Sequence, residues 1–344
     1  MKILKRVSLA VMVVALMGAP ANAQRHSPRA SAAPAETMPL TLTGAIAMPH
    51  VQGRIDHFAL GPEGTIFISA LGNNTEEVID LAAGIVAHAI PGIPRPQGVA
   101  YVPEVKEIFV GSDEGKLYIF DAQSYAQVTT IDFGDDVDNL RYDPASKHVY
   151  VGYGDGAIAM VDVTNNQRLP KEFKLGAHPE SFQLEKSGPN IYVNLPGLKQ
   201  IAAINRDSGS ITRWSIKEES NFPMALDEAD HRLFVVTREP ARLLVVDTRF
   251  GHVVSTLPCV QDSDDLYYDA PRKRIYAAGG EGYISVFQQE DPDHYRLLAK
   301  VPSRLGGRTA GYWGKLGKGF DRFYLAIPAR ADHEAEVLIY TIQD

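Results

Sequence analysis

The chain repeats one short pattern of residues seven times, and this repeat restricts the possible folds more than any other feature of the sequence. Each unit holds a short apolar segment, a turn, a stronger segment such as "IYV" or "VYV", a second turn, a segment that ends near Asp, and a last segment. The equivalent residues at the starts of the seven units are Asp56, Gln97, Asp138, Glu180, Phe222, Asp264 and Arg308, at intervals of 41, 41, 42, 42, 42 and 44 residues. A period of about 40 residues with four short strands is typical of a propeller blade. The sequence therefore predicts an all-β, seven-bladed β-propeller.

The apolar segments have the composition of strands rather than helices. Tyr150 and Val151, residues 191–193 and residues 234–236 are β-branched or aromatic runs bounded by Gly, Pro, Asp or Asn. Their apolar residues are consecutive, which fits a sheet that neighbouring blades cover on both faces. We expect four antiparallel strands in each blade.

The two ends of the repeat region predict how the ring closes. The seventh unit ends after its third strand, at residues 336–342, and residues 40–48 form a strand-like segment before the first unit. Pairing these two segments would complete the seventh blade and remove an open sheet edge. We therefore expect one propeller domain over residues 38–344.

The first 23 residues have the pattern of a secretory signal. Three basic residues precede an apolar run at 7–17, and "ANA" at 21–23 has the small-x-small form that signal peptidase cuts. The run is too short to span a bilayer. We expect cleavage after Ala23, a flexible tether rich in Ala, Pro and Ser over residues 24–37, and a periplasmic or secreted protein without a membrane span.

Charge and cysteine content restrict the classes of partner. The chain of 344 residues has a net charge of −8, which becomes −11 when residues 1–23 are removed with their three basic residues. This balance repels a phosphate backbone, so nucleic acid is not an expected partner. Cys259 is the one cysteine, which excludes an internal disulfide. We expect a monomer that binds an unidentified protein or a small polar ligand.

Two of the units, residues 147–169 and 189–211, resemble the exported bacterial β-propellers built from YVTN repeats. The pattern of that family is Tyr-Val-Thr-Asn, a turn, a strand ending in Ile-Asp, and a Gly turn into Val. Tyr192-Val193-Asn194 is similar but lacks the Thr, and Ile79-Asp80 matches the strand ending. The resemblance covers about residues 40–344 and implies the propeller fold. A more distant similarity to propeller lactonases implies that acidic and amide side chains at the starts of the inner strands hold a divalent cation.

The seven equivalent residues, called the ring residues below, also give the candidate site. The inner strands of a propeller run in one direction, so their first residues surround one mouth of the central channel. Carboxylates that face one another there raise each other's pKa unless a cation or basic side chains neutralise them. The candidate basic partners are Arg54, Arg95, His178 and Arg308, and the candidate ions are Ca²⁺ and Mg²⁺, which prefer oxygen ligands. The predicted ligand-binding residues are Asp56, His57, Gln97, Asp138, Asn139, Glu180, Asn221, Asp264, Asp265 and Arg308, of which Asp56, Asp138, Glu180 and Asp264 are the candidate metal ligands.

The adjacent pair Asp56 and His57 is not interpreted as a catalytic dyad. Adjacent residues on a strand point to opposite faces, so the two side chains would not face one reacting group if the inner strand begins there. We assign no catalytic residue from the sequence.

Three classes of function are compatible with these features. The first is a non-enzymatic binding or scaffold module that presents the channel mouth to a protein, polymer or small polar ligand. The alternative is a lactonase-like hydrolase in which a divalent ion polarises a carbonyl group. Direct salt bridges from Arg54 and Arg308 to the ring would favour the binding module. A second alternative is nucleic-acid binding through the insertion at residues 312–322, which carries Trp313, Lys315 and Lys318.

Overall fold

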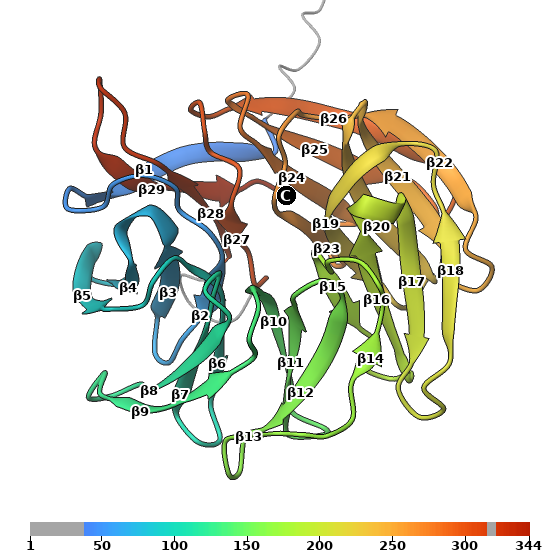
Figure 1. Cartoon of the computed structure of the whole chain (residues 1–344). Coiled ribbons are helices and arrows are strands. Elements are labelled where there is room, and N and C mark those ends of the chain that lie inside the picture. The colour runs from blue at the N-terminus through green and yellow to red at the C-terminus, as the bar shows by residue number, and fades with distance from the viewer. Residues whose placement is uncertain (1–37, 315–320) are drawn as a thin grey trace, which may run out of the picture. The chain divides into compact units, whose positions relative to one another are not determined.

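The computed structural model describes residues 38–314 and 321–344, and in this part of the chain seven antiparallel sheets follow one another around a ring (Figure 1). The predicted all-β, seven-bladed architecture is confirmed. The expected signal at residues 1–23 and tether at residues 24–37 lie outside the described residues. Within the described residues, no helix is long and apolar enough to cross a membrane.

Six blades are formed by consecutive strands, and the first strand of each blade faces the centre of the ring (Figure 1). Blade 1 contains β2 (Phe58–Leu60), β3 (Thr65–Ala70), β4 (Thr75–Asp80) and β5 (Ile85–Pro91). Blade 2 contains β6 (Pro96–Val102), β7 (Glu107–Ser112), β8 (Lys116–Asp121) and β9 (Gln127–Asp132). Blade 3 contains β10 (Val137–Asp143), β11 (His148–Tyr153), β12 (Ala157–Asp162) and two short outer strands, β13 (Gln167–Arg168) and β14 (Phe173–Lys174), which both pair with β12.

The remaining blades follow the same order. Blade 4 contains β15 (Phe182–Leu184), β16 (Asn190–Leu195), β17 (Gln200–Asn205) and β18 (Ile211–Ser215). Blade 5 contains β19 (Glu219–Asp227), β20 (Arg232–Glu239), β21 (Ala241–Asp247) and β22 (Val253–Pro258). Blade 6 contains β23 (Leu266–Asp269), β24 (Arg274–Gly279), β25 (Tyr283–Gln289) and β26 (Tyr295–Pro302). Blade 7 contains β27 (Ala310–Gly311), β28 (Arg322–Ile327), β29 (Ala335–Ile342) and β1 (Leu40–Met48). Two short 3₁₀ turns lie in other blades: η1 (Leu71–Asn73) follows β3 in blade 1, and η2 (Pro196–Leu198) follows β16 in blade 4.

The Asp or Asn at the end of several third strands shapes the turn that follows it. Asp80 Oδ1 accepts hydrogen bonds from the backbone N–H groups of Ala82 and Ala83, and Asp121 Oδ1 accepts the equivalent bonds from Gln123 and Ser124. Such local bonds replace the strand ladder and start a turn. This explains why the repeat pattern places a residue of this type at the end of the segment.

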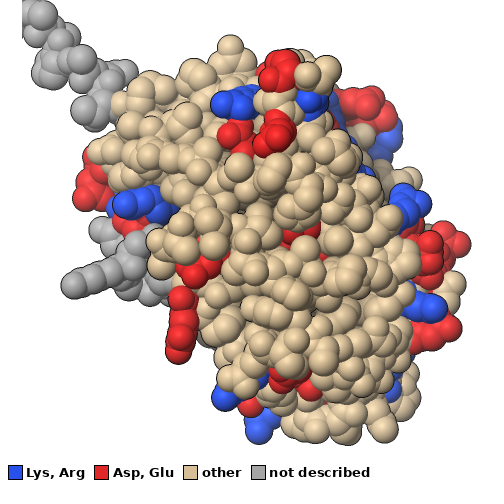
Figure 2. All heavy atoms as spheres, turned by 90° about the vertical axis from the view of Figure 1, so that its left-hand side faces the viewer, with Lys and Arg blue, Asp and Glu red and all other residues tan. Residues whose placement is uncertain are grey.

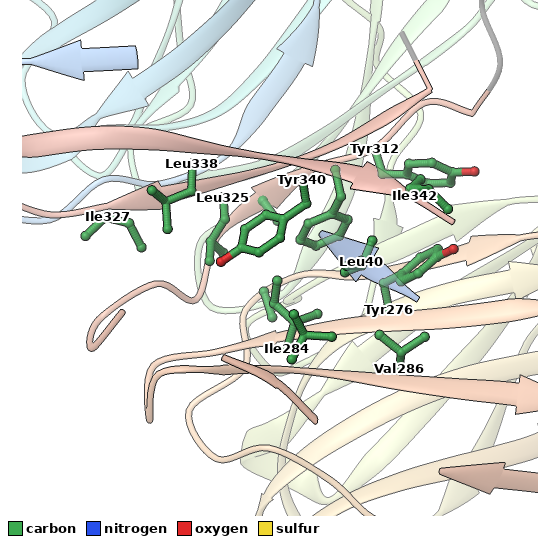
Figure 3. Packing of buried hydrophobic residues seen from close by; sticks show 14 residues of the cluster. Leu40, Tyr276, Ile284, Val286, Tyr312, Leu325, Ile327, Leu338, Tyr340 and Ile342 are labelled. Carbon is green, nitrogen blue, oxygen red and sulfur yellow. The ribbon is translucent and has the colours of Figure 1, made fainter. Parts of the chain in front are cut away.

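The ring closes as the sequence predicts. β1 pairs antiparallel with β29 from Leu40 opposite Ile342 to Met48 opposite Ala335, so the N-terminal strand becomes the outer strand of blade 7. Leu40 packs among side chains of blades 6 and 7, including Tyr276, Tyr340 and Ile342 (Figure 3). Closure leaves blade 7 with four strands and buries apolar residues from both ends of the domain.

The hydrophobic core lies between the blades rather than at the centre of the ring. Seven clusters of buried residues occur in the described part of the chain, and each joins two neighbouring blades. The middle strands are buried on both faces, as in β11, where Val149, Tyr150 and Val151 are all inaccessible or nearly so. Cys259 is a buried free thiol in the cluster between blades 5 and 6. The inner strands are thereby held in fixed positions around the channel.

Candidate functional site

The ring residues come together at one mouth of the channel. All seven of them line a single cavity of about 410 Å³, although they are spread over more than 250 residues of sequence. Two further repeat positions contribute to the same cavity. One lies two residues before a ring residue and supplies Arg54, Arg95, Asp136 and His178. The other lies at or just after the end of the second strand and supplies Asp113 and Arg238.

Asp56 and His57 both line this cavity, which differs from the expectation that adjacent side chains would diverge. The reason is that β2 begins only at Phe58, so the two residues lie before the regular strand. The strands β6, β10 and β19 begin before the ring residue of their blade, but their pairing with the second strand of the blade is irregular at that residue. A bulge of this kind breaks the strict alternation of side chains. Consecutive residues can therefore reach the same side of the backbone.

Eight of the ten predicted ligand-binding residues line the cavity, namely Asp56, His57, Gln97, Asp138, Asn139, Glu180, Asp264 and Arg308. The other two have different surroundings. Asp265 accepts a hydrogen bond from the Ala310 backbone N–H at 2.7 Å and faces a second cavity. Asn221 is fully buried and donates to Asn194 Oδ1 at 2.9 Å and to the Gln200 carbonyl at 3.0 Å. Asn221 is therefore a link between blades 4 and 5.

Three arginines, called the arginine group below, approach the carboxylates of blades 1 and 6. Arg54 lies 3.2 Å from Asp56, and Arg308 lies 2.7 Å from Asp264 and 3.0 Å from Asp262. The third is Arg238, which pairs with Asp264 and stacks over the Phe222 ring at 3.9 Å from its centroid. Phe222, the one apolar member of the seven ring residues, thus makes a cation–π contact with the Arg238 guanidinium.

Histidines rather than arginines approach the carboxylates of blades 3 and 4. His178 Nε2 lies 3.7 Å from Asp138 Oδ2, and His57 Nε2 lies 4.0 Å from Asp138 Oδ1. His57 also lies 3.8 Å from Asp56 and 3.5 Å from Asp265, so it stands among three carboxylates. Asp136 accepts a hydrogen bond from Gln97 Nε2 at 2.6 Å, and Arg95 pairs with Asp113.

Burial and neighbouring charges shift the pKa values of several of these groups. Burial raises the pKa of Asp56 to about 6, although His57 and Arg54 oppose the shift. Burial also raises the pKa of Glu180, and the Asp138 carboxylate adds to this shift. Burial alone would lower the pKa of His57, but Asp56, Asp265 and Asp138 outweigh it and raise the value to about 10. His57 therefore carries its proton at neutral pH and acts as an internal cation.

The predicted metal ligands do not form one group. Asp138 and Glu180 instead lie together with His178, with one ligand atom of each within 4.8 Å of the others. Asp56 and Asp264 face the arginine group. From the sequence, His178 is a candidate basic partner only, because a repeat alignment gives the position of a residue but not the direction of its side chain.

Arg238, Asp113 and Asp136 were missed by the sequence interpretation. Arg238 and Asp113 stand at the same repeat position, four residues after Phe234 and Phe109. Extending the alignment to the end of the second strand would have identified both. Asp136 lies two residues before a ring residue, where Arg54 and Arg95 were recognised by their positive charge.

The rest of the channel is more aromatic than its mouth. A second cavity of about 590 Å³ is lined by tyrosines from several blades and by Trp313, and it shares His57 and Ser181 with the first. Trp313 also lies 5.8 Å from the Tyr324 ring, between ring centroids. The Trp of the proposed nucleic-acid loop is thus packed, while Lys315 and Lys318 lie outside the described residues. In the view of Figure 2, Lys and Arg side chains are scattered among Asp and Glu and form no continuous basic patch among the described residues of that face.

The comparisons with known proteins place the fold but not the family. No protein-family model and no curated protein matches the chain. Similar solved structures include the crystal structure of RRP9 WD40 repeats, which is 12% identical, covers 87% of this chain and 99% of that chain, and has a TM-score of 0.73. A chain of the mitotic checkpoint complex is 13% identical, covers 98% of this chain and 100% of that chain, and has a TM-score of 0.75. A chain of Kuenenia stuttgartiensis hydrazine synthase is 17% identical, covers 86% of this chain and 98% of that chain, and has a TM-score of 0.71. At these identities the similarity shows a WD40-like, seven-bladed propeller fold and nothing about function.

Proposed function

We propose that the chain is an exported, non-enzymatic propeller related to the YVTN-repeat proteins, and that it binds a small organic anion in the cavity at its channel mouth. The observation that carries this proposal is the convergence of all seven ring residues on one cavity that also holds the arginine group. Inner strands beside these residues pack into the clusters between neighbouring blades, as β15 does through Phe182 and β19 does through Met224.

The arginine group keeps hydrogen-bonding capacity for a ligand. A guanidinium has five N–H donors. In the described residues, Arg54 contacts one carboxylate, that of Asp56, and Arg308 contacts two, those of Asp262 and Asp264. The side chain of Arg54 is 47% exposed and that of Arg308 is 23% exposed. Their remaining donors suit a carboxylate or phosphate, which guanidinium groups bind in a bidentate way.

The size of the cavity favours a small molecule over a protein or a polymer. A volume of about 410 Å³ falls within the range of roughly 300–1,000 Å³ that is usual for small-molecule sites. Its lining is strongly polar, with six carboxylates, four arginines and two histidines. Such a lining recognises charge and hydrogen-bonding groups rather than apolar surface.

The salt bridges favour a binding module over a metal-dependent hydrolase. Arg54 neutralises Asp56 and Arg308 neutralises Asp264, so two of the four candidate metal ligands already have cationic partners. The hydrolase is the second candidate, because Asp138, His178 and Glu180 lie close together at the same mouth. Hydrolysis of a lactone by the purified protein, lost after chelation, would favour it.

One sequence feature supports export, and one contact between blades supports the YVTN relationship. Residues 1–23 have the basic, apolar and small-residue order of a secretory signal. Asn194, the Asn of the best-matching repeat, donates to the Phe222 carbonyl of the next blade at 2.9 Å. An Asn at this repeat position can therefore tie one blade to the next.

Thermal shift measurements with a set of small probes test the proposed function. Citrate, succinate and inorganic phosphate represent anions, while putrescine and erythritol represent a cation and a neutral polyol of similar size. We expect at least one anion to raise the melting temperature in a concentration-dependent way, and Arg308→Met to weaken its binding by about tenfold or more.

The matched control is Arg296→Met, because Arg296 pairs with Glu290 on the outer edge of blade 6 at 3.1 Å and is exposed. This variant should bind the anion as the unmodified protein does. Stabilisation by putrescine alone, or equal loss of binding in both variants, would contradict the proposal. Far-UV circular dichroism shows whether each variant keeps its fold.

A further inference from the structure

Side chains of blades 3 and 4 form a cluster, called the carboxylate–histidine cluster below, on the side of the channel mouth away from Arg308. It consists of Asp138 on β10 and of His178 and Glu180, which precede β15. One ligand atom from each residue lies within 4.8 Å of the others, and His178 Nε2 is 3.7 Å from Asp138 Oδ2. Two ligands of a tetrahedral ion, each roughly 2.0–2.2 Å from it, stand about 3.4 Å apart. The ligand atoms would have to approach one another by up to about 1.4 Å to reach this spacing.

The imidazole of His178 is oriented as the imidazole of a metal ligand usually is. Its Nδ1 lies 2.8 Å from the carbonyl oxygen of Gly154. A carbonyl oxygen only accepts, so Nδ1 must carry the hydrogen and Nε2 is directed to Asp138. Metal-binding histidines typically donate their second ring N–H to a carbonyl or carboxylate, which fixes the ring and its tautomer.

A second observation at the same place is independent of the cluster. Asn139 is 1% exposed, lines the cavity, and donates from Nδ2 to Asp138 Oδ2 at 3.1 Å. Its Oδ1 atom is buried and has no hydrogen-bond partner among the described residues. A buried acceptor without a partner is costly. A water molecule held by a cation at Asp138 would supply the missing donor.

We propose that Asp138, His178 and Glu180 bind one divalent transition-metal ion, for which Zn²⁺ is the reference. Mixed imidazole and carboxylate ligands suit Zn²⁺ and its neighbours in the first transition row, whereas Ca²⁺ and Mg²⁺ prefer oxygen ligands alone. Three protein ligands leave a coordination position open toward the cavity. The site extends the proposed function without depending on it, because the arginine group takes no part in it.

Calorimetric titration of the purified, untagged protein tests this site after treatment with EDTA and desalting. We expect one Zn²⁺ per chain, weaker binding of Ca²⁺ and Mg²⁺, and a loss of Zn²⁺ affinity of about tenfold or more in His178→Gln. Absorption spectra with Co²⁺ provide a second readout, since His178→Gln should change the spectrum of the bound ion.

The control variant is His294→Gln. His294 pairs with Asp291 at 2.8 Å on the exposed rim of blade 6, so it is a His–Asp pair that lies outside the cavity. His294→Gln should bind Zn²⁺ as the unmodified protein does, and Arg308→Met should also bind Zn²⁺ unchanged although it binds the anion more weakly. Absence of Zn²⁺ binding, equal affinity in His178→Gln and the unmodified protein, or preferred binding of Ca²⁺ that His178→Gln does not affect would each overturn the proposal.

Discussion

Leu40 on β1 lies directly opposite Ile342 on β29, so the two ends of the propeller domain form one pair in blade 7. Leu40 is 2% exposed and packs between blades 6 and 7 (Figure 3). The one cysteine of the chain is free, so this closure is held by strand pairing and apolar packing. Pairing with β1 covers the edge of β29, which would otherwise be open.

Loss of the Leu40 side chain should therefore destabilise the whole ring. Leu40→Ala removes a buried side chain from a packed cluster, and we expect it to lower the free energy of unfolding by about 2–5 kcal/mol. Urea denaturation followed by far-UV circular dichroism measures the change. Leu42→Ala on the same strand is the control, because Leu42 is 52% exposed, and it should cost less than about 0.5 kcal/mol. Equal losses in the two variants would show that closure contributes little to stability.

Two arginines that contact the same carboxylate should differ greatly in their effect on stability. Arg232 lies 3.0 Å from Asp247 with 5% of its side chain exposed, and it joins blade 5 to the Pro292 carbonyl of blade 6 at 2.8 Å. Arg249 contacts Asp247 from the surface and is 51% exposed. We expect Arg232→Met to cost about 3–5 kcal/mol, because it leaves a buried carboxylate with less compensation. Arg249→Met should have a much smaller effect in the same urea experiment, because exposed ion pairs contribute little to stability.

The meeting of the ring residues at one channel mouth could be predicted from the sequence, but the pairing among their side chains could not. A repeat of constant length places equivalent residues on equivalent parts of the blades, so the seven ring residues were identified by counting. Which side chains meet depends on the local backbone instead. The late start of β2 brings His57 beside Asp56, and Arg238 crosses from blade 5 to Asp264 of blade 6. The first contact depends on where β2 begins, and the second joins residues of different blades, so residue spacing predicts neither of them.

Glu76 should make the protein less stable as the pH rises. It is fully buried, accepts a hydrogen bond from Ser69 Oγ at 2.8 Å, and has no partner for Oε1 among the described residues. Burial raises the pKa of Glu76 well above 4.5, although Ser69 opposes the shift, and the adjacent Glu77 adds to it. Above this ordinary value, the unfolded chain loses the proton while the folded chain retains it. Glu76 therefore favours unfolding by up to about 1.4 kcal/mol per pH unit until the folded form also ionises.

Glu76→Gln should remove this dependence, because the amide keeps the size of the side chain without a titrating group. Urea denaturation of both proteins between pH 4 and pH 8 measures the difference. Their stabilities should differ least at pH 4, and the advantage of the variant should grow as the pH rises. A difference that stays constant over this range would show that Glu76 is ionised in the folded protein.

Asn194 should be important both for blade packing and for the cavity. Its side chain is fully buried, donates to the carbonyl groups of Phe222 and Pro223 at 2.9 and 3.3 Å, and accepts from Asn221 at 2.9 Å. Asn194→Ala leaves these buried groups without one of their partners, so we expect a loss of about 1–3 kcal/mol in unfolding free energy. The control is Asn165→Ala, since Asn165 is exposed and bonds only to its own turn, through the Gln167 N–H, in the described residues.

The same substitution should weaken binding at the channel mouth. Asn194 fixes the backbone at Phe222, and the Phe222 ring supports the guanidinium of Arg238. A more mobile Phe222 would place Arg238 less precisely, and preorganised charges bind more tightly than mobile ones. Titration of the folded Asn194→Ala protein with the anion that stabilises the unmodified protein should show lower affinity, whereas Asn165→Ala should bind unchanged. Unchanged affinity in Asn194→Ala would show that Arg238 is held in place without this link between blades 4 and 5.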